Sequence, residues 1–245
     1  MSTAVGLHAL PSDRFEAKLA HTKAVLISAA AEHGPHIVQA TSLGAEDMVI
    51  TDLIAHQRLP IRIGTLDTGV LHAETLALLS QVESHYGLHV ERMQPRREAV
   101  VQFFARHGDR AMYESIDLRK ACCALRKLEP LGRLLEGQTA WITGLRREQS
   151  DHRAMVPEAE RETNGRVKLN PLADWTWGDV WHHIAAGGVP YNPLHDSFFP
   201  SIGCAPCTRA ISLGEDFRAG RWWWEDEAAK ECGLHVSKKP EGVTA

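Results

Sequence analysis

Two hydrophobic patterns take turns along the first 145 residues. Short apolar runs that end in polar or turn-forming residues predict strands at 36–41, 61–68, 88–93 and 140–145. Amphipathic segments predict helices at 13–33, 42–57, 71–87, 96–107 and 117–135, the last interrupted near Pro130. Strands that alternate with helices indicate an α/β fold, with a parallel twisted sheet flanked by helices on both faces.

This alternation ends after Val167. We predict a Trp-rich helix at about 176–186 and a long loop over 187–203. From Gly214 onward the chain is charged and Trp-rich, and then polar. We therefore expect residues 1–213 to form the main domain and residues 214–245 to form a mobile C-terminal segment.

Composition narrows the class of protein. The chain has 245 residues, of which 44% are hydrophobic and 24% are charged, a usual globular mixture that needs no disulfides. Its net charge of −4 argues against a protein that coats nucleic acid or an acidic membrane. No apolar run approaches the roughly 18 residues of a membrane span. The N-terminus lacks the basic region followed by an apolar region that is typical of a signal peptide. We expect a cytoplasmic protein with neither nucleic acid nor membrane as a partner.

Five cysteines carry the strongest chemical signal. Their odd number excludes complete pairing as disulfides within the chain. The segment GCAPCTRA combines a CxxC with a glycine and a proline, so a tight turn can aim two thiolates at one point. The adjacent CC pair favours an iron–sulfur cluster over zinc, although buried cysteines can also be small hydrophobes. The candidate metal ligands are Cys122, Cys123, Cys204 and Cys207, which leaves Cys232 as a candidate reactive thiol.

Three loops reach the carboxyl edge of the predicted sheet, where ligands bind in such folds. The first is a glycine-containing turn before a helix, which suits an anion but also suits an ordinary helix cap. The second offers groups for a ribose or a base edge, or again a cap. The third has two adjacent arginines, which suit phosphate or sulfate, or solvent. The candidates are Ser42, Gly44 and Asp47 in the first loop, Leu66 and Thr68 in the second, and Arg146 and Arg147 in the third.

Six motifs of this chain resemble those of one enzyme family: SLGAEDM, LDTG, KACCALRK, TGLRREQS, GCAPCTRA and ECGLH. From about Gln39 to His235 the chain resembles the assimilatory sulfonucleotide reductases, most closely the bacterial thioredoxin-dependent adenosine 5'-phosphosulfate reductases. The resemblance implies an adenine nucleotide α-hydrolase-like fold whose first loop is a modified pyrophosphate loop. ATP pyrophosphatases typically carry SGGxDS there. Leu43 and Met48 depart from that pattern, which argues against ATP cleavage.

The resemblance also implies a reaction and its residues. The four candidate ligands would bind a [4Fe-4S] cluster, and Cys232 would attack the sulfur of adenosine 5'-phosphosulfate to form an S-sulfocysteine and AMP. Reduced thioredoxin, or a glutaredoxin-like donor, would then release sulfite for sulfate assimilation and cysteine biosynthesis. His235 would orient the substrate or the thiolate. The positive charge on the sulfate and phosphate would come from Lys127, Arg147, Arg218 and Arg221.

Three alternatives remain at the level of sequence. A reductase of 3'-phosphoadenosine 5'-phosphosulfate would use the same chemistry, but such relatives usually lack the cluster cysteines. A sulfur-insertion ATP pyrophosphatase acting on tRNA is opposed by the altered first loop and the net charge. A non-catalytic zinc module would make Cys232 dispensable. The sequence leaves open whether the chain forms a homo-oligomer.

Overall fold

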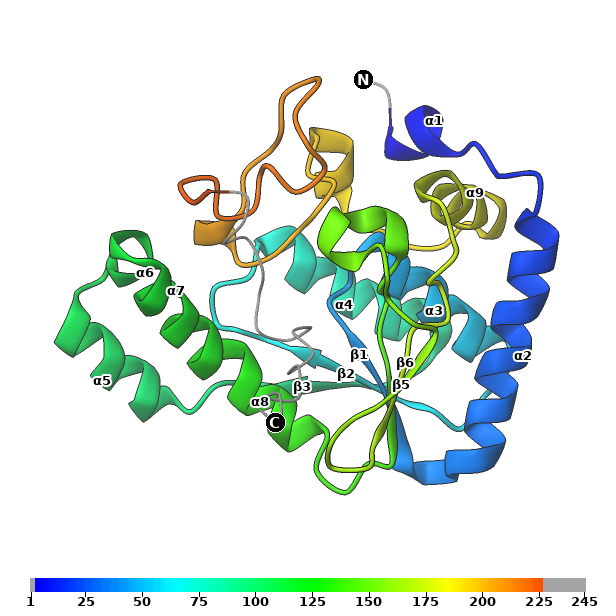
Figure 1. The fold of residues 1–245 in the computed structure, drawn as a ribbon, viewed down its shortest axis with the longest axis horizontal. Coiled ribbons are helices and arrows are strands. Elements are labelled where there is room, and N and C mark those ends of the chain that lie inside the picture. Colours follow the sequence, from blue (N-terminus) through cyan, green and yellow to red (C-terminus); the bar gives the residue numbers. More distant parts are fainter. Residues whose placement is uncertain (1–2, 227–245) are drawn as a thin grey trace, which may run out of the picture.

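Six strands form one sheet in the order β3-β2-β1-β4-β6-β5 in the computed structural model, which describes residues 3–226 (Figure 1). Neighbouring strands are parallel except for β5, which pairs antiparallel with β6. The strands are β1 (Ile37–Thr41), β2 (Arg62–Leu66), β3 (Val90–Met93), β4 (Ala140–Ile142), β5 (Ala159–Arg161) and β6 (Val167–Leu169). The expected α/β fold with a mostly parallel sheet is confirmed.

The sequence pattern missed the two strands at one edge. β5 and β6 have three residues each, and β5 reads Ala-Glu-Arg, with its two outer residues exposed. An exposed edge strand of this length buries no apolar face, so it leaves no hydrophobic period to detect. The sheet is therefore mixed, with an antiparallel edge.

The helices largely follow the predicted segments, with short ones added at the N-terminus and before the CC pair. They are α1 (Ala4–His8), α2 (Phe15–His33), α3 (Ala45–His56), α4 (Ala73–Tyr86), α5 (Arg97–His107), α6 (Ala111–Glu114), α7 (Ile116–Cys123), α8 (Glu129–Leu134) and α9 (Trp177–Gly187). Within residues 3–226, none of them is both long and apolar enough to span a bilayer.

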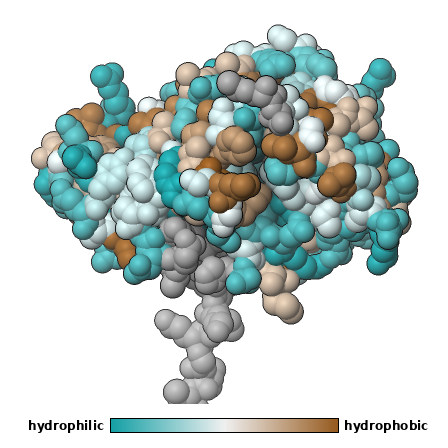
Figure 2. All heavy atoms as spheres, turned by 90° about the horizontal axis from the view of Figure 1, so that it is seen from above, coloured by the Kyte–Doolittle hydropathy of each residue, from teal (hydrophilic) through white to brown (hydrophobic). Residues whose placement is uncertain are grey.

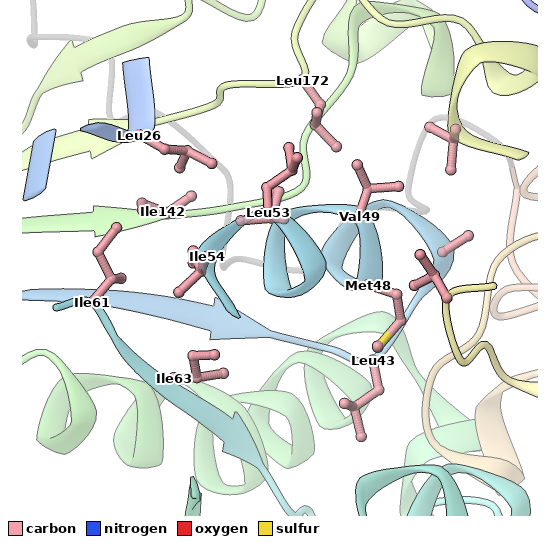
Figure 3. Close-up of a cluster of buried hydrophobic side chains, with 14 of the residues drawn as sticks. Leu26, Leu43, Met48, Val49, Leu53, Ile54, Ile61, Ile63, Ile142 and Leu172 are labelled. Carbon is pink, nitrogen blue, oxygen red and sulfur yellow. The ribbon is translucent and has the colours of Figure 1, made fainter. Parts of the chain in front are cut away.

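One face of the sheet carries the main hydrophobic core, shown in Figure 3. Ile37 of β1 and Ile142 of β4 point to this face, where α2, α3, α4 and α9 contribute side chains to the same cluster. Leu26 and Leu53 are almost fully buried between these layers. Burying each such side chain contributes about 1.5–3 kcal/mol to stability, so this core holds the helices against the sheet.

The opposite face is covered by α8. Val38 and Trp141, the neighbours in sequence of Ile37 and Ile142, point to this face and pack with Leu134. A Cβ atom at Gly64 of β2 would lie 2.4 Å from Cδ1 of Leu134, so only glycine lets α8 approach this strand. The alternation of neighbouring residues between two cores is what a sheet covered on both faces requires.

The long helix expected over 117–135 is divided by a wider, π-helical turn at Ala124–Leu128. The sequence places the interruption near Pro130, and the structure shows it just before that residue. Pro130 has no amide hydrogen, and its ring crowds the carbonyl group four residues earlier. The turn that precedes the proline is widened, which relieves this crowding. Such π-helical turns often occur at functional sites.

The sheet also determines where a ligand can bind. From β1 the chain continues to β2 and β3 on one side, whereas β4 pairs with β1 on the other. The connections therefore diverge at the carboxyl ends of β1 and β4. In open parallel sheets such a point of divergence leaves a crevice that binds ligands.

Candidate active site

The loop between β1 and α3 is held by its own side chains. The backbone amide and the hydroxyl of Ser42 each donate a hydrogen bond to Oδ2 of Asp47, at 2.6 Å. Leu43 adopts a φ of 59°, in the left-handed region, while its side chain is buried in the core. In the described part of the chain, no side chain caps α3 at Gly44. Ser42, Gly44 and Asp47 all line a cleft at this edge of the sheet.

The carboxyl group of Asp47 is unusually hard to ionise. Burial raises its pKa to about 6, and the hydrogen bonds from Ser42 only partly oppose that rise. The neighbouring charge of Glu46 also raises the pKa. Below about pH 6, Asp47 therefore holds a proton and adds no negative charge to the floor of the cleft.

The loop after β4 touches the first loop at Gly144. A Cβ atom there would lie 2.4 Å from Oδ1 of Asp47 and 2.9 Å from Cβ of Glu46. No side chain larger than hydrogen fits between the two loops. Gly144 thus permits the close approach of two of the three loops that the sequence places at this edge.

Arg146 and Arg147 lie outside the lining of the cleft in the described residues. Arg146 is almost fully buried and donates to Oε1 of Glu46 at 3.0 Å and to Oε2 of Glu148 at 2.9 Å. Its charge is therefore balanced by two carboxylates, and it braces the first loop. Arg147 pairs with Asp174 instead. Direct contact of either arginine with a substrate stays a prediction that this geometry does not support.

The loop after β2 joins the cleft to the cysteine turn. Leu66 and Thr68 line the cleft. The hydroxyl oxygen of Thr68 lies 3.3 Å from Sγ of Cys204, and Nη1 of Arg126 donates to the Thr68 carbonyl oxygen at 2.5 Å. Strand end, helix and cysteine turn are thereby tied together at one residue.

The cleft has an apolar part and a cationic part. Its apolar part includes Leu66, Leu131 and Trp141, which suits a flat, weakly polar ring. Figure 2, which views the molecule from above relative to Figure 1, shows hydrophobic side chains interspersed with hydrophilic ones on that face. The cations that line the same cleft are Lys127, Arg153, Arg218 and Arg221. An apolar ring bearing anionic groups fits both parts.

Arg221 is fixed in place on several sides. Its Nη1 donates to the Ser201 hydroxyl at 3.3 Å and to the Ile202 carbonyl oxygen at 3.2 Å. Its guanidinium carbon lies 4.8 Å from the ring centre of Trp222. A Cβ atom at Gly203 would come within 2.6 Å of the same guanidinium. The group is pre-organised, so it loses little freedom on binding an anion.

All four candidate ligands line a second, smaller cavity beside the cleft. Cys122, Cys123, Cys204 and Cys207 are buried cysteines that reach it from the end of α7 and from the turn at 204–207. That turn lies against α6, where the Tyr113 hydroxyl donates to the Pro206 carbonyl oxygen at 2.6 Å (Figure 1). The structure thus brings the two distant cysteine motifs to one cavity.

Among the described residues, the thiols of this cavity do not form a ready-made site for one metal ion. Within residues 3–226, no three cysteine, histidine or carboxylate side chains converge closely enough to bind one metal ion. A tetrahedral zinc site needs its thiolates at about 2.3 Å from one centre. A multi-iron cluster instead takes each thiolate on a separate iron.

The surroundings of the cavity also favour the protonated, uncharged form of its thiols. Burial raises the pKa of Cys207 to about 12, and the nearby Cys204 thiol raises it further while Lys127 lowers it. Burial likewise raises the pKa of Cys122, against the opposing effect of Arg126. Metal binding at these thiols must therefore displace protons.

Lys127 and Cys204 line both cavities. Lys127 belongs to the π-helical turn that follows the CC pair, and this turn carries it from the cysteine cavity to the cleft. The sequence places Lys127 one helical turn after Cys123, and the structure shows that turn to be a wide one. One cation therefore faces both the thiols and the space for a substrate.

Two predicted catalytic residues, Cys232 and His235, lie outside the described residues. Several other residues of the cleft escaped the sequence analysis, among them Glu46, Gln149, Arg153 and His195. Glu46 accepts hydrogen bonds from Arg146 and Gln149, which lie 100 and 103 positions away in sequence. A contact between such distant residues leaves no local pattern in the sequence.

The fold and the two adjoining cavities define an α/β protein with an open cleft at the carboxyl edge of its sheet and a cysteine-lined cavity beside it. Among solved structures it is similar to the phosphoadenylyl-sulfate reductase from Candida auris in its phosphate complex, with a TM-score of 0.65 and 28% identity over 81% of this chain and 94% of that one. Yeast FAD synthetase, at 14% identity and a TM-score of 0.57 over 80% of this chain and 67% of that one, shares the fold alone.

Sequence comparison then gives the family. A profile described as the phosphoadenosine phosphosulfate reductase domain matches residues 36–210. The adenosine 5'-phosphosulfate reductase of Allochromatium vinosum is 59% identical over 81% of this chain and 78% of the relative. That of Burkholderia cepacia is 50% identical over 97% and 94%. The chain belongs to the phosphoadenosine phosphosulfate reductase domain family.

Proposed function

We propose that this chain reduces adenosine 5'-phosphosulfate to sulfite and AMP, with electrons from reduced thioredoxin or a glutaredoxin-like donor. The observation that carries this proposal is the shared wall of the two cavities, where Lys127 and Cys204 line both. The names of the relatives support the unphosphorylated nucleotide as substrate.

The cleft matches the two ends of such a nucleotide. The adenine ring would lie against Leu66, Leu131 and Trp141, close to the carboxyl ends of β2 and β4. Ser42 and Gly44 of the first loop would bind the α-phosphate near the N-terminus of α3. The sulfate would then face the cationic part of the cleft, because sulfate and cations attract each other most strongly where water is excluded.

The chemistry needs cations because both reactants are anionic. A thiolate must approach a sulfur atom surrounded by negatively charged oxygens. Lys127, Arg218 and Arg221 would neutralise those oxygens and lower the pKa of the attacking thiol. Arg218 and Arg221 are both 8% exposed, so their interaction with an anion would be only weakly screened.

In the proposed reaction the Cys232 thiolate forms a bond to the sulfate sulfur, and the bond between that sulfur and the phosphate oxygen breaks. AMP leaves with the electron pair, and Cys232 carries the –SO₃⁻ group. A donor thiolate then attacks the sulfur atom of Cys232, and sulfite leaves with the electron pair. A second donor thiol resolves the mixed disulfide and restores Cys232. His235 would orient the substrate or the thiolate.

The four cavity cysteines would hold a [4Fe-4S] cluster. Their burial in one cavity that adjoins three cations fits such a group, since Arg119, Arg126 and Lys127 also line it. When bound, the cluster would supply a fixed, polarisable charge beside the sulfate. The protein's own part is to hold Lys127 between the two sites.

Two finer expectations accompany this proposal. A reducing cytoplasm would keep the four buried cysteines available as thiols. Residues 1–213 would form the nucleotide-binding domain, and the segment of residues 214–245 would bring Cys232 first to the substrate and then to the donor.

The decisive experiment measures sulfite release by anaerobically purified protein with reduced thioredoxin. Adenosine 5'-phosphosulfate is compared with its 3'-phosphorylated analogue, and Cys232→Ser is the control. We expect a strong preference for the unphosphorylated substrate, abolished in the variant. Preference for the 3'-phosphorylated analogue would instead assign the chain to the alternative specificity of its family. Sulfite release that persists in Cys232→Ser would contradict the nucleophile.

A further inference from the structure

A buried ion pair fastens the last part of the described chain to the helix that carries the CC pair. Arg119 of α7 donates from Nε to Oε1 of Glu225 at 2.9 Å and from Nη2 to Oε2 at 2.6 Å. The two side chains are 1% and 4% exposed. Two parallel charge-assisted hydrogen bonds fix direction as well as distance, unlike a single contact.

Trp222 reinforces the ion pair by packing against Arg119. The guanidinium carbon of Arg119 lies 4.5 Å from the ring centre of Trp222, which is 1% exposed. Trp222 has a φ of 42°, and its carbonyl oxygen accepts a hydrogen bond from the Glu225 amide at 2.8 Å. Residues 222–225 therefore form a tight turn clamped by Arg119 from one side.

The ion pair joins two parts of the proposed site. In α7, Arg119 lies one helical turn before Cys122 and Cys123 and lines the same cavity as they do. Glu225 precedes Cys232 by seven positions. Seven residues span at most about 25 Å when fully extended, so the place of Glu225 bounds the region that Cys232 can reach.

We propose that Arg119 and Glu225 are positioning residues, which anchor the origin of the segment that delivers Cys232 to the substrate. This inference rests on the proposed function for the role of Cys232. A thiol on a short tether reacts at an effective concentration set by the tether length and by the place of its fixed end. Without the ion pair, the last fixed point before Cys232 lies further back in the chain than Glu225. The Cys232 thiol can then reach a larger volume, so its effective concentration at the substrate falls.

The anchor predicts a specific kinetic signature. Neither residue lines the nucleotide cleft. Glu225→Gln and Arg119→Gln should therefore lower kcat for sulfite release by about tenfold or more, because removing one partner of a buried pair releases the other. The KM for adenosine 5'-phosphosulfate and the affinity for AMP should stay within about twofold. Arg119→Lys, which keeps the charge but not the paired hydrogen bonds, should recover part of kcat.

A second measurement does not depend on activity. Trypsin cleavage after Lys230 removes residues 231–245, and mass spectrometry follows it. We expect this cleavage to be about fivefold or more faster in Glu225→Gln than in the unaltered protein, since loss of the ion pair allows residues 222–226, which precede the site, to open locally. Glu91→Gln, which removes the exposed pair of Glu91 with Arg62 between β2 and β3, is the matched control and should change neither rate.

The outcomes separate the anchor from the reaction. An unaltered kcat and cleavage rate in Glu225→Gln, or a raised KM with unaltered kcat, would overturn the anchor. Absence of sulfite from the unaltered protein would overturn the proposed function, while the cleavage rates would still decide whether the pair fixes the segment. If Glu225→Gln does not fold, the Arg119→Gln/Glu225→Gln double variant leaves no buried charge and carries the same two measurements.

Discussion

The hydroxyl oxygen of Thr68 lies 3.3 Å from the sulfur atom of Cys204, so the loop after β2 contacts a proposed cluster ligand directly. When Cys204 is a thiolate it can only accept, and Thr68 donates. Thr68→Val should remove this hydrogen bond and make iron loss to a chelator about fivefold faster, as expected for about 1 kcal/mol. Thr68→Ser keeps the hydroxyl and should behave like the unaltered protein. Equal rates for all three proteins would show that the contact has no effect on the metal site.

Lys127 faces both cavities, so its removal should affect both. Lys127→Ala is expected to lower sulfite release by about 10²-fold, the usual effect of losing one charge that stabilises a transition state. The visible absorption of the metal-loaded protein should change as well, because the cation also borders the cysteine cavity. Lys120→Ala removes an exposed lysine from the same helix and is the control. A normal rate in Lys127→Ala would refute its catalytic role.

The iron content tests the four cysteines. Anaerobically purified protein should contain about four iron and four sulfide ions per chain. Cys207→Ser should lose most of both, whereas Cys232→Ser should keep them. One zinc ion per chain without sulfide would favour the zinc module and contradict the cluster.

Asp47 gives the folded state a distinctive pH dependence. Its pKa is about 6 in the folded protein because of burial, against about 3.9 in an unfolded chain. Between these two values the folded state holds the proton more tightly, so stability falls as the pH rises from about 4 to about 6. The loss is about 2 kcal/mol in order of magnitude.

Asp47→Asn removes this titrating group, so the variant is the reference for the pH dependence of the unaltered protein. Urea unfolding of both proteins between about pH 4 and pH 7 should show the unaltered protein losing stability relative to the variant as the pH rises. A constant difference across that range would mean that Asp47 ionises at its ordinary pKa in the folded protein.

Gly144 predicts a steric effect with a built-in comparison. Gly144→Ala would drive a Cβ atom into Asp47 and Glu46, and should destabilise the protein by about 1–3 kcal/mol. Gly132 of α8 has open space around the equivalent atom, so Gly132→Ala should be neutral or stabilise by up to about 1 kcal/mol. Thermal unfolding of the two variants measures the difference.

How far the sequence could predict the structure depends on the range of each interaction. The strands at β1 to β4 and the helices between them each bury a periodic apolar face, so the pattern alone locates them. The cysteine motifs and Lys127 were found because their chemistry is local. The pairing of Arg146 with Glu46 and of Arg119 with Glu225 was not, because each joins positions at least 100 residues apart. The same long-range pairing holds Arg146 against Glu46 in the structure, and its contact with a ligand stays a prediction.

The π-helical turn at Ala124–Leu128 sets the rotational phase of everything that follows the CC pair. Deleting one residue from it, for example Ala124, would restore an α-helical turn and rotate Lys127 by about 100° relative to the cysteines. Cys122 and Cys123 would keep their direction, so the thiol cavity would survive while the cation between the cavities turned away. The number of residues between the CC pair and Lys127 therefore determines the direction in which the lysine points. A side-chain substitution cannot produce the same change of direction.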